Sequence, residues 1–554
     1  MSLFSVHRCS RCSRLYCLHN LRAPPSSCAV FNLRSRLKVV KITTSSSEII
    51  RGGGGGLFKS RSLRLFSKRS LGQFSTLKAS KSDESPSAAS TADDDIEAFA
   101  AKAQGGRLWS NVNAVSMKHE PGSLFGSACL VAGTTVGAGI LALPNATVDA
   151  GFVPSAVTIL LCWAFMAGTG LLVAEVNLQT SCELGSGGVS IMTMAKRTLG
   201  NTGSNVSSAA YIFLHYCLLV AYISRGGEGM AGLLGAPKDS LMYTVGGPLA
   251  YTVPLCVLCY APPQRILEGV NSALVAGVVI SFGSILAYNV PNVDVAALLH
   301  APVPPVRGSE PLDAAIGSIP VVALAFVYHN VIPVCVTNLE GDVRNIRKAI
   351  IYGSGAPLAM FLLWNAAVLG QVPALQTLGY LGGAGEVTDP VAALESYVAS
   401  TGTGVIALAS SSFAFFAVAT SFIGFVLGLS DFFTDFVASS TLSSQKNAKD
   451  GSSSSSTDRR GALPILLTVV PPFILATSGG KEIFFSALDY AGTFGVMVLF
   501  GVLPPIMAWR ARYADNVLLA TRPLLPGGQP ALVGLGAFAA LVILRDTYVR
   551  VAGG

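Results

Sequence analysis

The sequence predicts an all-α membrane protein of about eleven transmembrane helices, arranged as two sets of five plus one extra helix. Of the 554 residues, 51% are hydrophobic and only 12% are charged, whereas soluble domains average about 25% charged residues. Apolar segments of spanning length follow one another along most of the chain. The first and sixth of them contain helix-breaking residues, and matching breaks in two halves are typical of transporters with inverted repeats.

In chain order, the predicted spans are 123–149, 152–178, 207–234, 243–260, 269–290, 314–338, 346–370, 401–430, 462–478, 484–509 and 531–550. The first five form one repeat, residues 123–290, and the next five form the second, residues 314–509. The last span is the extra helix. Within the second repeat, the Ser-rich segment 439–460 predicts a disordered loop.

The first 80 residues differ from the rest in charge. They contain ten Arg and five Lys against a single acid, Glu48, together with sixteen Ser, so this segment carries +14 while the whole chain carries +8. An acid-poor, Arg- and Ser-rich start without a long apolar run is typical of an organelle transit peptide. The Ser content and the run Gly52–Gly56 favour a plastid over a mitochondrion. A basic cytosolic tail is the alternative.

Residues 81–122 are polar and acidic, which predicts a flexible arm before the first span. Among the Lys and Arg residues near the membrane, sixteen fall on the side of this arm and five on the opposite side. Because positive residues favour the interior face, the N-terminus is expected to face inward. In the inner envelope membrane of a chloroplast, that side is the stroma.

The first span contains Gly133-Thr134-Thr135-Val136-Gly137-Ala138-Gly139-Ile140-Leu141-Ala142-Leu143-Pro144, in which four of twelve residues are Gly or Pro. Such a segment predicts an interrupted helix. In lipid, unwound backbone persists only where it lines a cavity or meets a ligand. The backbone is therefore expected to bind substrate, with close helix packing as the alternative. The candidate residues are Gly133, Thr134, Thr135, Gly137, Ala138 and Gly139.

The sixth span contains a second expected break, between Pro320 and Pro333. Polar side chains at mid-span are costly in a membrane and usually functional, so this break is expected to face the same cavity. Half-helix N-termini suit a carboxylate, and unwound carbonyl groups suit a cation, so a zwitterionic amino acid fits both. The candidate residues are Phe326, Tyr328, His329 and Asn330. For His329, a hydrogen bond to a neighbouring helix is the alternative.

The motifs GTTVGAGILALP, SIPVVALAFVYHNVIP and LGLSDF, in this order, resemble the tyrosine/tryptophan permease family of bacterial aromatic amino acid carriers. The resemblance covers roughly residues 120–510. It implies eleven spans, a LeuT-like core of five plus five helices, and secondary transport of an amino acid coupled to protons. Val327 and Asn330 stand where bacterial members are expected to have small residues, which indicates a pocket of different shape.

Four further side chains are candidates for ion coupling. Arg225 and Glu228 lie one helical turn apart and can pair. Deep in the membrane, Glu228 is a candidate proton carrier, whereas at the outer end of the span the pair is simply solvated. In LeuT-like carriers, hydroxyl groups at the level of Thr420 and Ser421 can bind Na⁺, although hydroxyl groups also serve helix packing.

A membrane-embedded enzyme is the rival class. Asp431 and Asp435 have the i, i+4 spacing seen in membrane prenyltransferases, which bind a metal–diphosphate through paired Asp clusters, but the sequence contains no second cluster. It also contains no HExxH, GxSxG or P-loop motif. We therefore expect no enzyme, no cofactor, no metal site and no nucleic-acid partner. The expected partners are an amino acid, a coupling ion and the lipid bilayer.

The leading hypothesis is a proton-coupled carrier of aromatic amino acids, tyrosine or tryptophan, in the plastid inner envelope. A carrier of the same fold for another amino acid or metabolite, driven by Na⁺, is the alternative.

Overall fold

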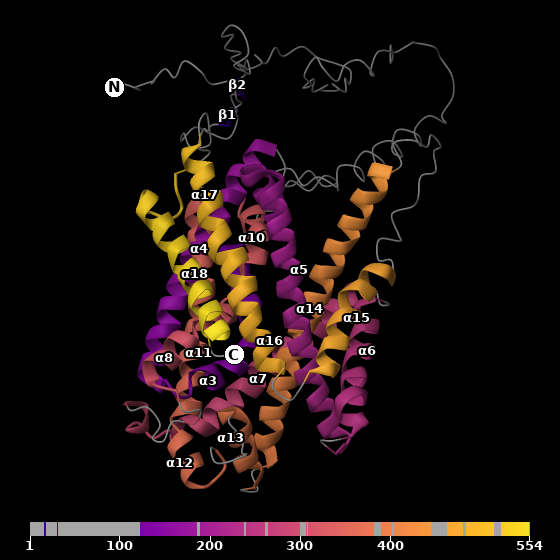
Figure 1. Cartoon of the computed structure of the whole chain (residues 1–554), viewed down its shortest axis with the longest axis vertical. Helices are drawn as coiled ribbons and strands as arrows, with labels where there is room; N and C mark the ends of the chain where they lie inside the picture. Colours follow the sequence, from indigo (N-terminus) through magenta and orange to yellow (C-terminus); the bar gives the residue numbers. More distant parts are fainter. Residues whose placement is uncertain are drawn as a thin grey trace, which may run out of the picture. The chain divides into compact units, whose positions relative to one another are not determined.

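The computed structural model is a bundle of long helices (Figure 1). It describes residues 16–17, 30–31, 122–184, 189–237, 240–260, 264–299, 306, 309–381, 389–400, 404–444, 462–479, 483–514 and 522–552. The expected transit peptide and acidic arm lie outside this part of the chain, except for Gly122 and two short strands. These strands, β1 (Tyr16–Cys17) and β2 (Val30–Phe31), pair antiparallel.

The first five spans occur where the sequence predicts them. The first consists of two helices bent by 54° at a short break. They are α2 (Leu124–Thr135) and α3 (Gly139–Thr147). They are followed by α4 (Phe152–Leu184), α5 (Ile191–Leu233), a short π-helix η2 (Met242–Gly246) leading into α6 (Gly247–Tyr260), and α7 (Gln264–Asn289). The range of α5 joins two helices at Gly200, whose φ of 74° is not helical, so the third span begins after Gly200, a few residues before the predicted start at 207.

The second set begins with another interrupted span. The short 3₁₀ turns η3 (Val290–Asn292) and η4 (Ala297–Leu299) lead to α8 (Pro311–Gly317), α9 (Ile319–Ala325), η5 (His329–Val331) and α10 (Ile332–Asn338). The next elements are α11 (Val343–Leu369), α12 (Val372–Thr377), α13 (Pro390–Ser400), α14 (Gly404–Ser444) and α15 (Ala462–Ser478). The tenth span joins α16 (Ile483–Tyr490), the π-helix η7 (Ala491–Val502) and α17 (Leu503–Tyr513), and α18 (Gly528–Ala552) follows.

Within the described residues, nine helices are long and apolar enough to cross a membrane, and the bent pair α2–α3 makes ten. The predicted ninth span, 462–478, corresponds to α15, which is shorter, with 17 residues, and is not among these ten. The predicted loop 439–460 is wrong at its start, because α14 continues to Ser444. No Gly or Pro interrupts the chain between Asp431 and Asp450, so nothing in this sequence stops the helix early. The rest of that loop lies outside the described residues.

The two ends of the bundle differ in which elements they hold (Figure 1). At one end, called here the basic end, α5 and α11 begin and α14 and α17 finish. The opposite end holds α12 and α13, and is called here the α13 end. In the interior, α5 packs against α6, α14, α15 and η7, while α11 packs against α2 and α4. The broken spans therefore lie among long continuous helices.

A buried ion pair joins span two to the end of span ten. The Arg512 guanidinium donates from Nε to Glu175 Oε1 at 2.6 Å and from one terminal nitrogen to Oε2 at 2.8 Å. The Leu524 N–H also donates to Glu175, at 2.7 Å. The Arg512 side chain is only 2% exposed and that of Glu175 5%. Since both charges are buried, removal of one leaves the other without compensation.

Replacing Glu175 with Ala should therefore lower the free energy of unfolding by about 3–5 kcal/mol, because the Arg512 guanidinium stays buried without a partner. Thermal melting of the detergent-purified variant measures this loss. The matched control is Glu183→Ala, since its partner Arg197 is 48% exposed and such surface pairs contribute about 1 kcal/mol or less. Equal melting temperatures for the two variants would contradict this account.

Candidate functional site

The break in the first span is three residues long, Val136 to Ala138, between α2 and α3. The predicted residues Gly133, Thr134 and Thr135 are not unwound, since they form the last turn of α2. Helix geometry leaves the last carbonyl groups of a helix without an intrahelical donor, so these residues still offer backbone oxygens at the break. The Thr134 and Thr135 hydroxyls donate back to carbonyls of their own helix, each at 2.7 Å.

The break in the sixth span runs from Phe326 to Tyr328 and continues into the 3₁₀ turn η5. Pro320 and Pro333 lie in the first turns of α9 and α10, where a missing N–H costs no hydrogen bond. The two prolines therefore start the half-helices on either side of the break. The interruption itself is polar, with Tyr328, His329 and Asn330 in succession.

The two breaks meet inside the bundle. A methyl group at Gly139, the first residue of α3, would lie 2.9 Å from the Ala325 Cα atom at the end of α9. Only glycine allows the two half-helices to approach this closely, because any Cβ atom there would collide with backbone. The N-terminus of α3 therefore lies directly beside the C-terminus of α9, and the sequence-predicted residues of both spans come together.

The eighth span, α14, also touches the first break. The Ala138 N–H donates to the Ser421 hydroxyl at 3.2 Å, and that hydroxyl donates to the Ala417 carbonyl oxygen of its own helix at 2.9 Å. A Cβ atom at Gly137 would lie 2.7 Å from the Ser421 oxygen. Thr420 bonds only within α14, donating to carbonyl oxygens one turn earlier. Of the two predicted hydroxyls, Ser421 contacts the break.

Tyr328 and His329 point into helix packing. The Tyr328 hydroxyl donates to the Met166 carbonyl oxygen of α4 at 3.2 Å. His329 Nε2 shares a hydrogen bond with the Thr169 hydroxyl at 3.0 Å, and its ring stacks on Tyr328 and on Phe500 of η7, with centroids 5.0 and 4.6 Å apart. A hydrogen bond from His329 to a neighbouring helix, the alternative considered from the sequence, is therefore present.

Two polar atoms at this break remain without a protein partner. His329 Nδ1 and Asn330 Oδ1 are buried, and neither forms a hydrogen bond with any described residue. Buried polar atoms almost always have a partner, so each such atom calls for a ligand or a water molecule. Phe326, in contrast, is fully buried against Phe361 of α11, with ring centroids 5.0 Å apart. Phe326 therefore packs the break against α11.

Comparisons with known proteins agree on one family. Residues 120–545 match the tryptophan/tyrosine permease family. This chain belongs to the tryptophan/tyrosine permease family. Similar relatives include "Tyrosine-specific transport system 1" of Haemophilus influenzae, 30% identical over 395 residues, which are 70% of this chain and 88% of the relative. The "Tryptophan-specific transport protein" of the same organism is 27% identical over 399 residues, with the same coverage.

Another bacterial relative of this permease is the "Tryptophan-specific transport protein" of Pseudomonas aeruginosa, 28% identical over 433 residues, which cover 74% of this chain and 91% of the relative. Among solved structures, a manganese transporter of Eremococcus coleocola aligns with 76% of this chain and 86% of its own, at 15% identity and a TM-score of 0.45. The three bacterial relatives are all named as transport proteins or transport systems.

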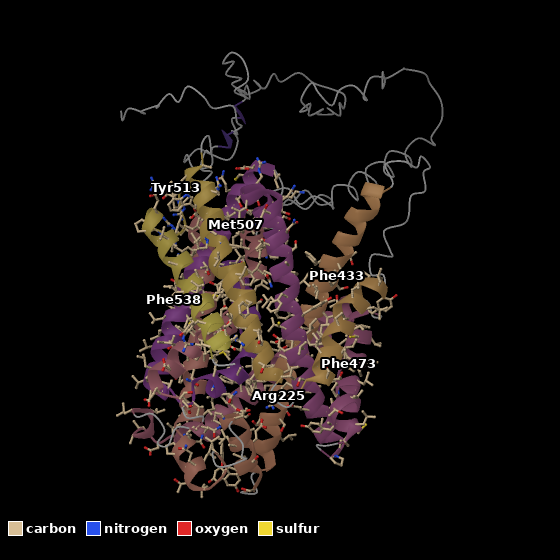
Figure 2. The ribbon with its side chains drawn as sticks, in the orientation of Figure 1. Arg225, Phe433, Phe473, Met507, Tyr513 and Phe538 are labelled. Carbon is tan, nitrogen blue, oxygen red and sulfur yellow. The ribbon has the colours of Figure 1, made fainter. Side chains whose placement is uncertain are left out.

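In this permease, Arg225 and Glu228 do pair, with Nη1 and Oε2 3.4 Å apart, and both side chains are partly buried. Figure 2 places Arg225 in the half of the bundle that holds the α13 end. The carboxylates of Glu395 and Asp389, in and before α13, also act on this guanidinium electrostatically. The pair therefore belongs to a charged cluster at the α13 end.

The rival cluster lies on α14. Asp431 is exposed, and the side chain of Asp435 lies outside the described residues. In the described part of the permease, no three His, Cys, Asp or Glu side chains come together in an arrangement that could hold a metal ion.

Sequence reasoning missed the supporting residues of the site. Thr169 and Met166 of α4 and Phe500 of η7 hold His329 and Tyr328, yet nothing in their local sequence marks them. The π-helix brings Gly492 against the Pro320 carbonyl group, where a Cβ atom would lie 2.3 Å from the oxygen. Three glycines within Ala491–Gly501 were the available signal for this close packing.

Gly139→Ala should destabilise the permease by about 1–3 kcal/mol, because the added methyl group collides with the backbone of α9. Gly133→Ala, in the same motif, should be neutral or stabilising, since nothing lies within 4 Å of its Cβ position and Ala favours helix over Gly. Melting temperatures of the two purified variants test this difference. Equal destabilisation would mean that the two half-helices do not touch at Gly139.

Proposed function

We propose that this permease is a secondary active transporter that carries an aromatic amino acid, tyrosine or tryptophan, together with a proton. The observation that carries the proposal is the contact between two unwound segments of the first and sixth spans. Its relatives are named as tyrosine- and tryptophan-specific transport proteins, which supports an aromatic substrate. In this proposal, the two breaks are the two halves of one substrate site.

The two helix ends at the first break offer opposite charges. The last-turn carbonyl groups of α2, from Gly133 to Thr135, form a negative helix end that suits the substrate ammonium group. The N-terminus of α3, at Ala138 and Gly139, is a positive helix end that suits the carboxylate. Because the ends of α2 and α3 are separated by only three residues, one zwitterion can contact both.

The substrate side chain would then meet the second break. Asn330 Oδ1 is a hydrogen-bond acceptor without a protein partner. Tyrosine and tryptophan both carry a donor at the far side of the ring, the phenol O–H or the indole N–H. A substrate that lacks this donor would leave Asn330 Oδ1 unpaired, which costs about 1–3 kcal/mol. We therefore assign Asn330 as the residue that favours these two substrates over phenylalanine.

Transport requires the site to open on each side in turn. In the proposed cycle, a unit containing the two broken spans, α2–α3 and α9–α10, rocks against the long helices α5 and α14. Ser421 lies at the boundary between these two groups, because it belongs to α14 and accepts the Ala138 N–H. We do not assign ion coupling to the Arg225–Glu228 pair, because its two charges already compensate each other in a charged cluster at the α13 end.

Counterflow in proteoliposomes tests the substrate. Vesicles loaded with unlabelled tyrosine should accumulate labelled tyrosine and tryptophan, but not labelled leucine. Asn330→Ala should reduce the preference for tyrosine over phenylalanine by about tenfold, the equivalent of one lost hydrogen bond. Uptake of leucine without uptake of either aromatic substrate would contradict the proposal and favour a carrier of the same fold with another substrate.

The proposed location is the chloroplast inner envelope, with the basic end facing the stroma. This rests on the Arg- and Ser-rich residues 1–80 and on the excess of positive residues at the basic end. A fusion of residues 1–120 to a fluorescent protein should enter chloroplasts of plant cells. A fusion that stays in the cytosol, or that enters mitochondria, would overturn this location without affecting the proposed substrate.

A further inference from the structure

A line of polar side chains follows the seam between α5 and α14. Tyr211, His215 and Tyr222 of α5 all contact aromatic residues of α14. Over the eleven residues from Tyr211 to Tyr222, α5 rises about 16 Å. Polar side chains at this depth are costly in a membrane and usually functional. Neither the substrate site nor the Arg225 cluster uses Tyr211 or His215.

His215 lies in the middle of this seam and is 2% exposed. Its Nδ1 atom is 2.8 Å from the Tyr211 carbonyl oxygen. Because a carbonyl oxygen only accepts, Nδ1 must carry the hydrogen, and Nε2 of the neutral ring is then the basic nitrogen. No described residue forms a hydrogen bond with Nε2. The ring is therefore held in the tautomer that is ready to take a proton at Nε2.

The Nε2 atom of His215 faces Gly428 of α14, which has no side chain. A methyl group at Gly428 would stand 3.7 Å from His215 Nε2 and 3.3 Å from the Tyr211 hydroxyl oxygen. Two polar atoms from α5 therefore face the same bare stretch of the neighbouring helix. They are no more than about 7 Å apart, and the two rings are in contact, with centroids 3.9 Å apart.

The seam leads toward the basic end through Asp431. This carboxylate is exposed, lies one turn beyond Gly428 and acts electrostatically on Tyr211. Figure 2 shows Phe433, two residues further along α14, in the opposite half of the bundle from Arg225. An exposed carboxylate beside the Tyr211 hydroxyl is a suitable collector of protons from that side.

In the other direction the seam reaches the substrate site. Tyr222, two turns beyond His215, lies near the Ser421 side chain, which accepts the N–H of Ala138 in the first break. Phe425 packs against the rings of both His215 and Tyr222, at centroid distances of 4.9 and 5.7 Å. His215 is thus linked to the break through Phe425, Tyr222 and the hydrogen bond between Ser421 and Ala138.

We propose that His215 is the side chain that carries the coupled proton, taking it at Nε2 and releasing it to the basic end through the space over Gly428. The proposal rests on the proposed function and names the coupling residue. The step is a proton transfer alone: neutral imidazole gains H⁺ to become imidazolium and later returns it to water. No bond to substrate forms, and no oxidant or reductant is needed.

Few other titratable groups face this seam. The packed segments of α15 and η7 contain none. Of the charged groups on the neighbouring helices α16 and α17, Asp489 is paired with Arg550 and Arg512 with Glu175. The remaining candidates in the described part of the seam are Tyr211 and Tyr222 of α5, Tyr251 of α6 and Asp431 of α14. None of these four groups has an ordinary pKa near neutral pH, whereas histidine does.

Proteoliposomes with the membrane potential clamped separate substrate binding from proton coupling. With one proton per substrate, a gradient of one pH unit should drive accumulation of labelled tyrosine to about tenfold in the wild-type permease. His215→Gln can still donate an N–H to the Tyr211 carbonyl group but cannot carry a proton. Its counterflow should persist, while its accumulation ratio under the pH gradient should fall to one.

A second variant guards against a folding defect at position 215. Gly428→Ala places a methyl group 3.7 Å from Nε2 and 3.3 Å from the Tyr211 hydroxyl oxygen, which requires that hydroxyl to shift by a few tenths of an ångström. The variant should slow pH-driven uptake at least tenfold while counterflow persists. Gly424→Ala, one turn earlier on α14 with nothing within 4 Å of its Cβ position, should behave as wild type. So should Tyr216→Phe, since that hydroxyl donates to Leu467 on α15.

The outcomes distinguish the two proposals. Absence of aromatic counterflow in the wild type would reject the proposed function. Wild-type counterflow with normal pH-driven accumulation in folded His215→Gln and in Gly428→Ala would reject the role of His215 alone. If both variants lose counterflow as well as pH-driven uptake, the role of His215 is also rejected, because the seam would then serve substrate binding or folding.

Discussion

The structure depends on one constraint, which is that unwound backbone inside a membrane must find partners other than water or lipid. Two helices are broken in this bundle, and each break is supported by the other. Gly139 lets α3 approach the end of α9, and the Ala138 N–H is bonded to Ser421 of α14. Two buried polar atoms at the second break, His329 Nδ1 and Asn330 Oδ1, remain without a protein partner.

The same constraint explains why the two breaks are both buried and polar. The long helices α4, α5, α11 and α14 exclude lipid from the breaks, while the atoms left over, such as Asn330 Oδ1, face inward without partners. An amino acid would supply opposite charges and a hydrogen-bond donor in one molecule. The same arrangement makes the empty site costly, which favours movement of the half-helices once substrate has bound or left.

Much of the fold was predictable because its causes are local. Glycine and proline set the positions of both breaks, and apolar runs set the spans. The boundary of the first break was less predictable, since Gly133 stays helical when nothing crowds it. The role of His329 could not be derived from its span alone, because Thr169 and Phe500, which hold it, come from helices far away in sequence. The seam at His215 was missed for the same reason.

The central claim, that the two breaks form one substrate site, can be measured on the backbone itself. Amides outside helical hydrogen bonds exchange with deuterium faster than those inside. Saturating tyrosine should slow exchange in peptides that cover 136–139 and in those that cover 326–331, while peptides from α18 stay unchanged. If tyrosine binds, as verified by equilibrium dialysis of the same sample, and exchange at both breaks remains the same, the claim is wrong.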